Sequence, residues 1–262
     1  MKNAPLQAWC IVPYDSAQRS PSERAAMLRK LGIKRLAYDW RYKDLDHMDL
    51  EVAALRGEGL EMSALWALSQ SDAAATDAHL AIIFDFVARN ELGIPLWVTL
   101  MAPPDYDIWG ASKRLAHTVE AMAEMADRAA DVGCSVALYN HGGWFGEPAS
   151  QAAIVKEAAR ANLGIVYNFR HGHAHIADFA DHAAAMLPYL HAVNLNGMRV
   201  GGPKTLPFGS GDHEFDMLLT LLRGGYAGPL GLINHQETVD AEQALRLNLN
   251  GLARLKRWLK DA

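Results

Sequence analysis

The chain has 262 residues, half of them apolar, and a formal net charge of −5 at pH 7. This length suits one large α/β barrel or two small domains, and the apolar fraction supplies a substantial core. Lys and Arg are scattered along the chain, which argues against a nucleic-acid partner. Because no apolar run approaches the roughly 18 residues of a membrane span and the N-terminus lacks a secretory pattern, we expect a cytoplasmic protein without a membrane partner.

Short apolar runs of strand-forming residues alternate with Ala- and Leu-rich helical stretches along the whole chain. In the stretch 112–133, for example, Leu115, Val119, Met122 and Ala126 recur at helical spacing and leave the charges on the other face. Eight runs are predicted strands, at residues 9–13, 35–40, 61–67, 96–101, 135–140, 164–169, 192–196 and 230–234.

Helix boundaries in the sequence agree with this alternation. Ser20, Pro21 and Glu23 form a predicted capping box with proline at the first helical position, and the segment 240–243 repeats the pattern with Asp and Gln. Turns such as "LGIK", "LGIP" and "DVGC" place Gly where a helix should give way to the next strand. Eight such units without a flexible linker predict an α/β fold with a single (β/α)8 TIM barrel as one domain over residues 1–262.

An open doubly wound sheet is the alternative architecture. It would require a Gly-rich phosphate-binding turn after the first strand, and "CIVPYDSAQRS" contains no such turn. The two cysteines, Cys10 and Cys134, each lie inside an apolar run, so we expect buried free thiols and no disulfide.

Asn and His gather where four predicted strands end. In a TIM barrel the chemistry lies at the carboxyl ends of the strands. A single Asn at such a place is usually a turn cap, and a single His is as often a surface residue. Their repetition on four strands nevertheless predicts one shared polar pocket. The residues concerned are Asn140, His141, Asn168, His171, His173, Asn194, Asn196, Asn234 and His235.

Other strand-end residues are candidates for substrate binding. Tyr14 and Asp39 follow the first two strands, and Trp66 and Trp144 offer aromatic faces that suit a sugar ring, although both could equally be core. Lys204, after the seventh strand, could neutralise an oxyanion or be an exposed loop lysine. We expect the remaining histidines to be solvated on helical segments (His47, His79, His117, His182, His213) or structural (His175, His191).

Several segments resemble the xylose isomerase-like TIM barrels, a superfamily of sugar phosphate isomerases and epimerases that also contains metal-dependent AP endonucleases. These are "VALYNHGGW", "GIVYNFRHGH", "VNLNG" and the run from "LPFGSGDHEFD" to "GYAGPLGLINH", in which Gly209, Gly211, Phe215 and Asp216 match the most specific positions. The resemblance extends from about residue 30 to the C-terminus. It implies the barrel fold and a small-molecule carbohydrate substrate.

The metal site of that family does not carry over. Its Glu, Asp, His and Glu ligands fall on Tyr139, Asn168, Asn194 and, less securely, Ile233, which lack the carboxylates that Mn²⁺ or Mg²⁺ prefer. We therefore expect no metal cofactor, with Asn168, Asn194 and Asn196 as amide donors to the substrate. The alternative is one divalent metal, Zn²⁺ or Mn²⁺, held by imidazoles of His141, His171, His173 or His235.

The leading hypothesis is a carbohydrate isomerase, epimerase or lyase that removes a proton next to a keto group of a sugar or keto-glycoside. His141 and His171 are the predicted acid/base pair, with His235 as a third candidate, because neutral imidazole has a pKa near working pH. A sugar-binding pseudoenzyme without activity is the alternative. A glycosidase would need two facing carboxyl groups among Asp15, Asp39 and Glu237. The oligomeric state is left open, and a homo-oligomer is compatible with the sequence.

Overall fold

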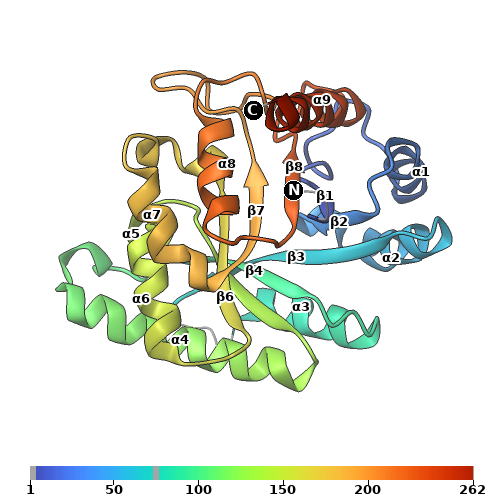
Figure 1. The fold of residues 1–262 in the computed structure, drawn as a ribbon. Coiled ribbons are helices and arrows are strands. Elements are labelled where there is room, and N and C mark those ends of the chain that lie inside the picture. The colour runs from blue at the N-terminus through green and yellow to red at the C-terminus, as the bar shows by residue number, and fades with distance from the viewer. Residues whose placement is uncertain (1–3, 73–76, 262) are drawn as a thin grey trace.

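The computed structural model describes residues 4–72 and 77–261, and its eight parallel strands form a closed barrel in chain order (Figure 1). Each strand pairs with the next, and β8 pairs with β1. The fold class predicted from the sequence is therefore confirmed. The strands are β1 (Leu6–Trp9), β2 (Arg35–Tyr38), β3 (Glu61–Gln70), β4 (Pro95–Met101), β5 (Ser135–Tyr139), β6 (Leu163–Asn168), β7 (Leu190–Leu195) and β8 (Leu230–Ile233).

Helices surround the barrel, and in Figure 1 α8 lies outside β7 while α4 and α6 lie beside each other. The α-helices are α1 (Pro21–Leu31), α2 (Met48–Gly57), α3 (Ala78–Arg89), α4 (Ala111–Asp131), α5 (Gly143–Gly146), α6 (Pro148–Ala158), α7 (Phe179–Met186), α8 (Glu214–Arg223) and α9 (Ala241–Asp261). Short 3₁₀ turns are η1 (Tyr42–His47), η2 (Tyr106–Ile108), η3 (Phe169–His171), η4 (His173–His175) and η5 (Leu187–Tyr189).

Every predicted strand is present, but the ends differ. The first strand spans Leu6–Trp9 and shares only Trp9 with the predicted strand 9–13, because Cys10 takes a left-handed φ of 53° that turns the chain out of the sheet. The second ends at Tyr38, so Asp39 and Trp40 belong to the loop that follows. These early ends lengthen the loops that surround the mouth of the barrel.

The predicted helix boundaries have the expected caps. The Ser20 hydroxyl accepts from the Glu23 N–H, while the Glu23 carboxylate accepts from the Ser20 N–H, which completes the capping box of α1. Gly32 ends this helix with a left-handed φ of 71°. At α9, the Asp240 carboxylate accepts the N–H groups of Glu242 and Gln243 at 2.7 and 3.2 Å.

Large aromatic side chains fill the barrel beneath its mouth. Trp9, Trp97 and Tyr139 are buried inside, with the two indole rings 4.8 Å apart, and they pack against small side chains such as Ala64 and Ala137. The barrel is thus a packed core whose upper surface forms the floor of any site at the mouth. Cys10 and Cys134 are buried free thiols, as expected.

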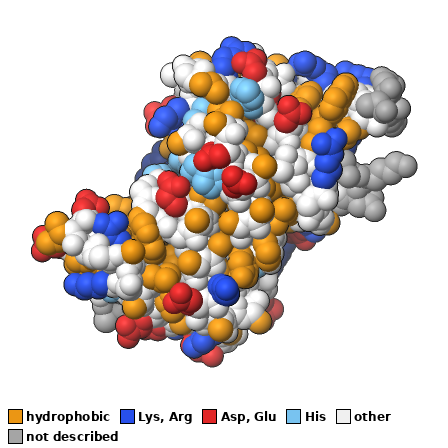
Figure 2. All heavy atoms as spheres, turned by 60° about the vertical axis from the view of Figure 1, so that its left-hand side comes forward, with side chains coloured by type: hydrophobic (Ala, Val, Ile, Leu, Met, Phe, Trp, Pro, Cys, Tyr) orange, Lys and Arg blue, Asp and Glu red, His pale blue; other side chains and the backbone are white. Residues whose placement is uncertain are grey.

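The outer surface carries mixed chemistry. On the face shown in Figure 2, apolar, acidic and basic side chains are interspersed, and the basic ones stand singly or in small groups. Among the helices of residues 4–72 and 77–261, none has the length and apolar character needed to cross a membrane.

Candidate active site

Three imidazoles gather at the carboxyl end of the barrel. His141 follows β5 and His171 ends η3 after β6, and their ring centroids are 4.8 Å apart. His235 follows β8 with a left-handed φ of 57°, and its ring lies 4.1 Å from the ring of Tyr14. The left-handed backbone at His235 decides which of residues 234 and 235 belongs to this cluster. The side-chain amide of Asn234 donates to the carbonyl of Tyr14 and is not part of it.

These three histidines are uncharged at neutral pH. Burial lowers the pKa of His171 to about 3, helped by the charges of His141 and Arg170. Burial, then Arg170 and Arg41, lowers the pKa of His235 to about 3. The pKa of His141, which lies at the exposed rim, is lowered by desolvation of its ring and then by the same two arginines. Each ring is therefore able to accept a proton.

Tyr139 lies between the core and the imidazoles. Its hydroxyl oxygen accepts hydrogen bonds from Trp9 Nε1 at 3.2 Å and from Asn168 Nδ2, and its ring centroid is 5.6 Å from that of His171. Burial raises the pKa of this phenol, so it keeps its proton. With both lone pairs of the oxygen engaged, the O–H is left to donate, and it has no acceptor among the described residues.

Most strand-end asparagines have their amides occupied by the protein. Asn140 exchanges two hydrogen bonds with the backbone of Asn168, at 2.7 and 3.1 Å. Asn168 itself is fully buried, donates to Tyr139 and accepts from the Arg170 N–H at 3.0 Å. Asn196 bonds the carbonyls of Gly197 and Lys204 and the N–H of Leu206. We therefore reassign Asn168 and Asn196 from substrate donors to supports of the surrounding loops.

Asn194 lies deeper. It is fully buried, and neither amide atom has a hydrogen-bond partner among the described residues. Its Oδ1 fills the space beside Gly231, where an added Cβ would come within 1.9 Å of it. A buried amide without partners costs about 1–3 kcal/mol, so this group is held there by the packing around it. Its role as a substrate donor stays a prediction.

A thiol supports the third histidine. Cys10 Sγ lies 3.4 Å from His235 Nδ1, and the His235 N–H donates to the Cys10 carbonyl at 3.1 Å. Burial and the neighbouring Asp39 carboxyl raise the pKa of Cys10 well above its usual value, so it stays a thiol. Burial raises the pKa of Asp39 to about 7, although Arg41 and the Val12 N–H oppose the shift. The sulfur therefore holds Nδ1 of His235, and Nε2 has no hydrogen-bond partner among the described residues.

Aromatic side chains line the mouth from two sides. The Arg41 guanidinium lies 5.0 Å above Trp66 and 5.7 Å from Tyr14, and Trp66 Nε1 donates to Thr99 Oγ1 at 3.0 Å. On the other side Trp144, in α5, borders a cavity of about 240 Å³ that is also lined by Tyr139 and His141. Both predicted aromatic platforms therefore lie beside the polar cluster.

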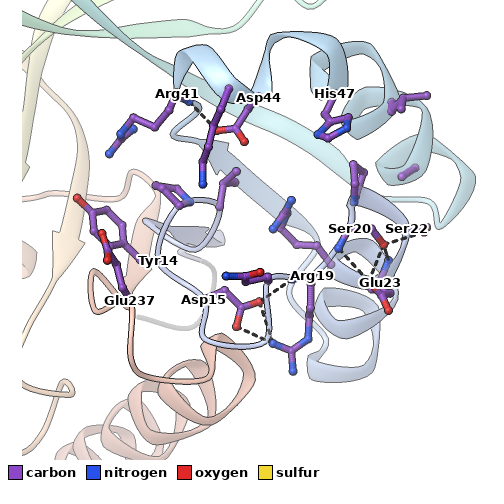
Figure 3. A pocket seen from close by; sticks show the side chains of 18 residues that line it. Tyr14, Asp15, Arg19, Ser20, Ser22, Glu23, Arg41, Asp44, His47 and Glu237 are labelled. Carbon is purple, nitrogen blue, oxygen red and sulfur yellow. Dashed lines mark hydrogen bonds and ion pairs between the residues drawn. The ribbon is translucent and has the colours of Figure 1, made fainter.

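A larger hollow, of about 990 Å³, lies to one side of the mouth (Figure 3). Tyr14, Arg41 and Glu237 stand at one end of it, and Ser20 and Glu23 at the other. It is a groove between the loops after β1 and β2, joined to the histidine cluster through Tyr14 and Arg41.

The other predicted site residues lie at the edge of the cluster or away from it. His173 is half-buried, with Nδ1 3.1 Å from the Arg170 carbonyl, and no ring contact joins it to the three imidazoles within the described chain. Lys204 is exposed on the loop after β7. Of the possible glycosidase carboxylates, Asp15 is paired with Arg19 at 2.9 Å.

One histidine expected to be solvated is buried. The ring of His79 stacks on Trp40 at 4.8 Å, accepts from the Leu68 N–H at 3.3 Å and bonds the Tyr42 hydroxyl at 3.1 Å. That expectation was wrong because the helical pattern gave no sign that β3 and η1 would both pack over the start of α3. His175, expected to be structural, is buried and bonded to Tyr167 and Glu147.

Three residues of this cluster escaped the sequence analysis as site candidates. The family resemblance marks Tyr139 only as a position without a metal ligand, and the sequence pattern gives no reason to select Arg41 or Arg170 over their neighbours. The available signal was position, since each lies within three residues of the end of its strand. Arginines at strand ends are therefore candidate site residues in the same way as histidines.

The residues present do not fit the metal that the family implies. At its four positions stand the Tyr139 phenol, two carboxamides and the Ile233 side chain, and the Asn168 amide is already committed to Tyr139 and Arg170. Arg41 and Arg170 add positive charge beside them. No group of three His, Cys, Asp or Glu side chains within the described ranges is arranged to hold a metal ion. A carboxylate-held divalent cation therefore has neither ligands nor a favourable field here.

Comparison with known proteins gives a consistent answer for the fold. A family model described as xylose isomerase-like TIM barrel matches residues 11–259. Similar solved structures include a 3-keto-D-glucoside 4-epimerase from E. coli (15% identity, TM-score 0.68, covering 97% of this chain and 100% of that one). A D-psicose 3-epimerase gives 15% identity and a TM-score of 0.67, over 95% and 97% of the chains.

A probable 3-DHS dehydratase from Bacillus anthracis is also similar, with 14% identity and a TM-score of 0.71 over 95% of this chain and 98% of that one. Comparison with curated protein sequences finds no significant match.

Proposed function

The chain belongs to the xylose isomerase-like TIM barrel family, and from this premise we propose that it is a sugar isomerase or epimerase that removes a proton next to a keto group. The observation that carries the proposal is the contact between two neutral imidazoles, His141 and His171, 4.8 Å apart beside the Tyr139 hydroxyl. Epimerases among the solved structures of the same fold support a sugar substrate.

The chemistry begins at the substrate carbonyl. As a proton leaves the neighbouring carbon, negative charge develops on the carbonyl oxygen, and a donor aimed at that oxygen lowers the barrier. The Tyr139 O–H is such a donor, because Trp9 and Asn168 occupy the acceptor positions of its oxygen. The preorganised phenol then stabilises the charge that develops on the carbonyl oxygen.

The proton itself passes to an imidazole. His141 and His171 are in ring contact, so they serve one face of a bound sugar and do not enclose it from two sides. One ring removes the proton, and the same ring or its neighbour returns it to the adjacent carbon, as an isomerase requires. An epimerase must also deliver a proton from the opposite face.

His235 is the candidate for that opposite face, since it comes from β8 and lies against Tyr14. We assign its hydrogen to Nδ1, donated to Cys10 Sγ, because the thiol hydrogen is drawn to the neighbouring Asp39 carboxyl. Nε2 is then an acceptor that faces the mouth.

Solvent deuterium exchange tests the proposal without knowledge of the product. A panel of ketoses, keto-glycosides and keto-sugar acids is incubated with the protein in D₂O, and NMR follows loss of the proton next to the carbonyl. We expect exchange in at least one compound and its loss in His171→Asn. The variant His47→Asn changes an exposed histidine outside the cluster and is the matched control.

The metal assignment is checked in the same assay. Treatment with a chelator followed by dialysis should leave the exchange rate unchanged, since the donor set offers no carboxylate cage. A chelator-sensitive rate restored by Zn²⁺ would support the imidazole-held metal instead. Binding of a panel sugar with no exchange in any compound would favour the sugar-binding pseudoenzyme.

A further inference from the structure

Arg41 stands at the mouth with part of its guanidinium unused. Its Nη1 donates to the backbone carbonyls of Asp39 and Trp40 at 2.9 and 2.7 Å, while the group lies over Trp66 and Tyr14. Within residues 4–72 and 77–261 it makes no ion pair, and neither Nη2 nor Nε has a hydrogen-bond partner. The backbone and the aromatic rings therefore hold a cation in place while its outer edge is left for a ligand.

Arg170 is placed in the same manner from the other side. Its Nε donates to Thr205 Oγ1 at 3.0 Å, and its backbone N–H donates to the Asn168 amide. Neither Nη group is bonded to any described residue. Lys204, next to Thr205, is exposed, and Asn196 holds its carbonyl at 3.1 Å. Two loops thus present two further cations without a carboxylate partner in the described chain.

The three cations border the same histidine cluster. The Arg41 guanidinium lies 5.7 Å from the ring of Tyr14, which contacts the His235 ring at 4.1 Å, while Arg170 precedes His171 and bonds Thr205, next to Lys204. Arg41 and Arg170 both act on His141 and His235, and Arg170 and Lys204 both act on His171. One neighbouring carboxyl group, Asp39, is buried and has its pKa raised to about 7, so at neutral pH it offsets only part of one charge. A chain with a net charge of −5 therefore gathers positive charge at the mouth of its barrel.

Two other carboxylates lie near Arg41 without pairing with its guanidinium. Asp44 accepts the Arg41 backbone N–H at 2.7 Å, and Glu237 lines the adjoining groove with Tyr14 (Figure 3). Neither cancels the charge of Arg170 or Lys204, which come from the loops after β6 and β7.

We propose that the substrate carries an anionic group, a carboxylate or a phosphate, which binds between Arg41, Arg170 and Lys204. This inference rests on the proposed function, whose substrate class it narrows from sugars in general to sugar acids or sugar phosphates. A guanidinium suits either anion, because its planar fork donates two parallel hydrogen bonds to paired oxygens.

Anion binding would also raise the pKa of the histidines that act as bases. The groups that face His171 are Tyr139, His141, His235, Arg170 and Lys204. Burial lowers its pKa to about 3, and the two cations add to that shift. A bound anion cancels that field, which raises the pKa of the imidazole toward working pH, where a general base is most effective. The substrate therefore activates the residues that act on it.

The test measures anion binding separately from turnover. Calorimetry of the full chain uses inorganic phosphate and malonate as probes, with Arg41→Gln and Arg170→Gln as variants. Arg199→Gln is the matched control, because that arginine is paired with Asp212 at 2.9 Å outside the cluster. We expect at least one probe to bind the wild type and each mouth variant to bind it about tenfold to a hundredfold more weakly. Binding of phosphate alone or malonate alone distinguishes sugar phosphates from sugar acids.

Two results would overturn the proposal: no binding of either probe to the wild type, or equal weakening in Arg199→Gln. Thermal unfolding of each variant checks that the fold is intact. Deuterium exchange into fructose, fructose 6-phosphate and 5-ketogluconate separates this proposal from the proposed function. Anion binding without exchange in any compound leaves the anion site standing and removes the isomerase. Exchange into all three compounds at rates that Arg170→Gln leaves unchanged does the reverse.

Discussion

The molecule holds two groups of histidines that differ in what their ring nitrogens bond. In the inner group, His141, His171 and His235 meet at the mouth. The Cys10 sulfur is the one side-chain hydrogen-bond partner of their ring nitrogens among the described residues. The outer group is His175 and His182, whose ring nitrogens are bonded to other side chains. Those of His175 lie 3.0 Å from the Tyr167 hydroxyl and 3.1 Å from a Glu147 oxygen.

The difference predicts two roles for histidine in this chain, one in stability and one in ligand binding. An imidazole with both nitrogens bonded stabilises the packing around it, and its partners decide its tautomer. An imidazole held by ring contacts, with a nitrogen unbonded, contributes little to stability and stays available to a ligand. We therefore expect substitutions in the inner group to affect activity, and those in the outer group to affect stability.

Substitution of His171 should give the largest effect. His171→Asn removes a base while its neighbour Tyr139 remains, and we expect turnover to fall by about 10²- to 10⁴-fold. The same range applies to His141→Gln. Unfolding by denaturant should show little change for either variant, because neither ring has a hydrogen-bond partner to lose within the described chain. Wild-type exchange rates in both variants would remove the acid/base assignment.

The outer group should respond in the opposite sense. His175→Phe keeps the ring but leaves the fully buried Tyr167 hydroxyl without its partner, which should cost about 1–3 kcal/mol of the free energy of unfolding. Deuterium exchange by this variant should match the wild type. The double variant His175→Phe, Tyr167→Phe removes both partners and should recover most of the loss. If His175→Phe alone is as stable as the wild type, this hydrogen bond contributes nothing to the free energy of unfolding.

The pH dependence of stability sharpens the same contrast. His171 and His235 bind a proton near pH 3 in the folded chain but near 6.5 when unfolded, so the unfolded state gains protons first as the pH falls. Stability is therefore unaffected by these two groups above about pH 6.5 and declines from there toward pH 3. Each contributes at most about 1.4 kcal/mol per pH unit, less any relief from solvent. Urea unfolding from pH 7 to 4 should show a shallower decline in the variant His171→Asn, His235→Asn than in the wild type.

The barrel and its strand order could be predicted from the sequence because they depend on the alternation of apolar runs and helical periods, which all eight units repeat. The meeting of His141 with His171 followed from the rule that strand ends converge. The hydrogen bonds of the asparagines did not follow, since Asn168 and Asn196 bond to loops whose paths only the folded chain defines, and Asn140 bonds to the end of the neighbouring strand β6.

Among the asparagines, Asn168 caps a local turn through the Arg170 N–H, whereas Asn140 and Asn196 bond segments farther along the chain. The orientation of His235 was equally out of reach, because it depends on a left-handed residue at 235 and another at Cys10. Neither is a glycine, so no turn residue marked the place. The pattern of residue types therefore predicts where the polar cluster lies, while local backbone geometry decides which side chains enter it.

The smallest effect is expected at His182, on the exposed side of the outer group. Its Nε2 lies 3.4 Å from Asp178, whose side chain is 59% exposed, and its ring lies 4.2 Å from that of His175. Since exposed ion pairs contribute about 0–1 kcal/mol, His182→Asn should change the free energy of unfolding by no more than about 0.5 kcal/mol. The measurement is the urea midpoint at pH 7, beside His175→Phe. A loss of unfolding free energy as large as that of His175→Phe would mean that the two rings stabilise the fold as one unit. Ring contact alone would then account for the contribution of an outer histidine to stability. The inner pair, in similar ring contact at 4.8 Å, would then also have to carry stability, which the comparison between the two groups denies.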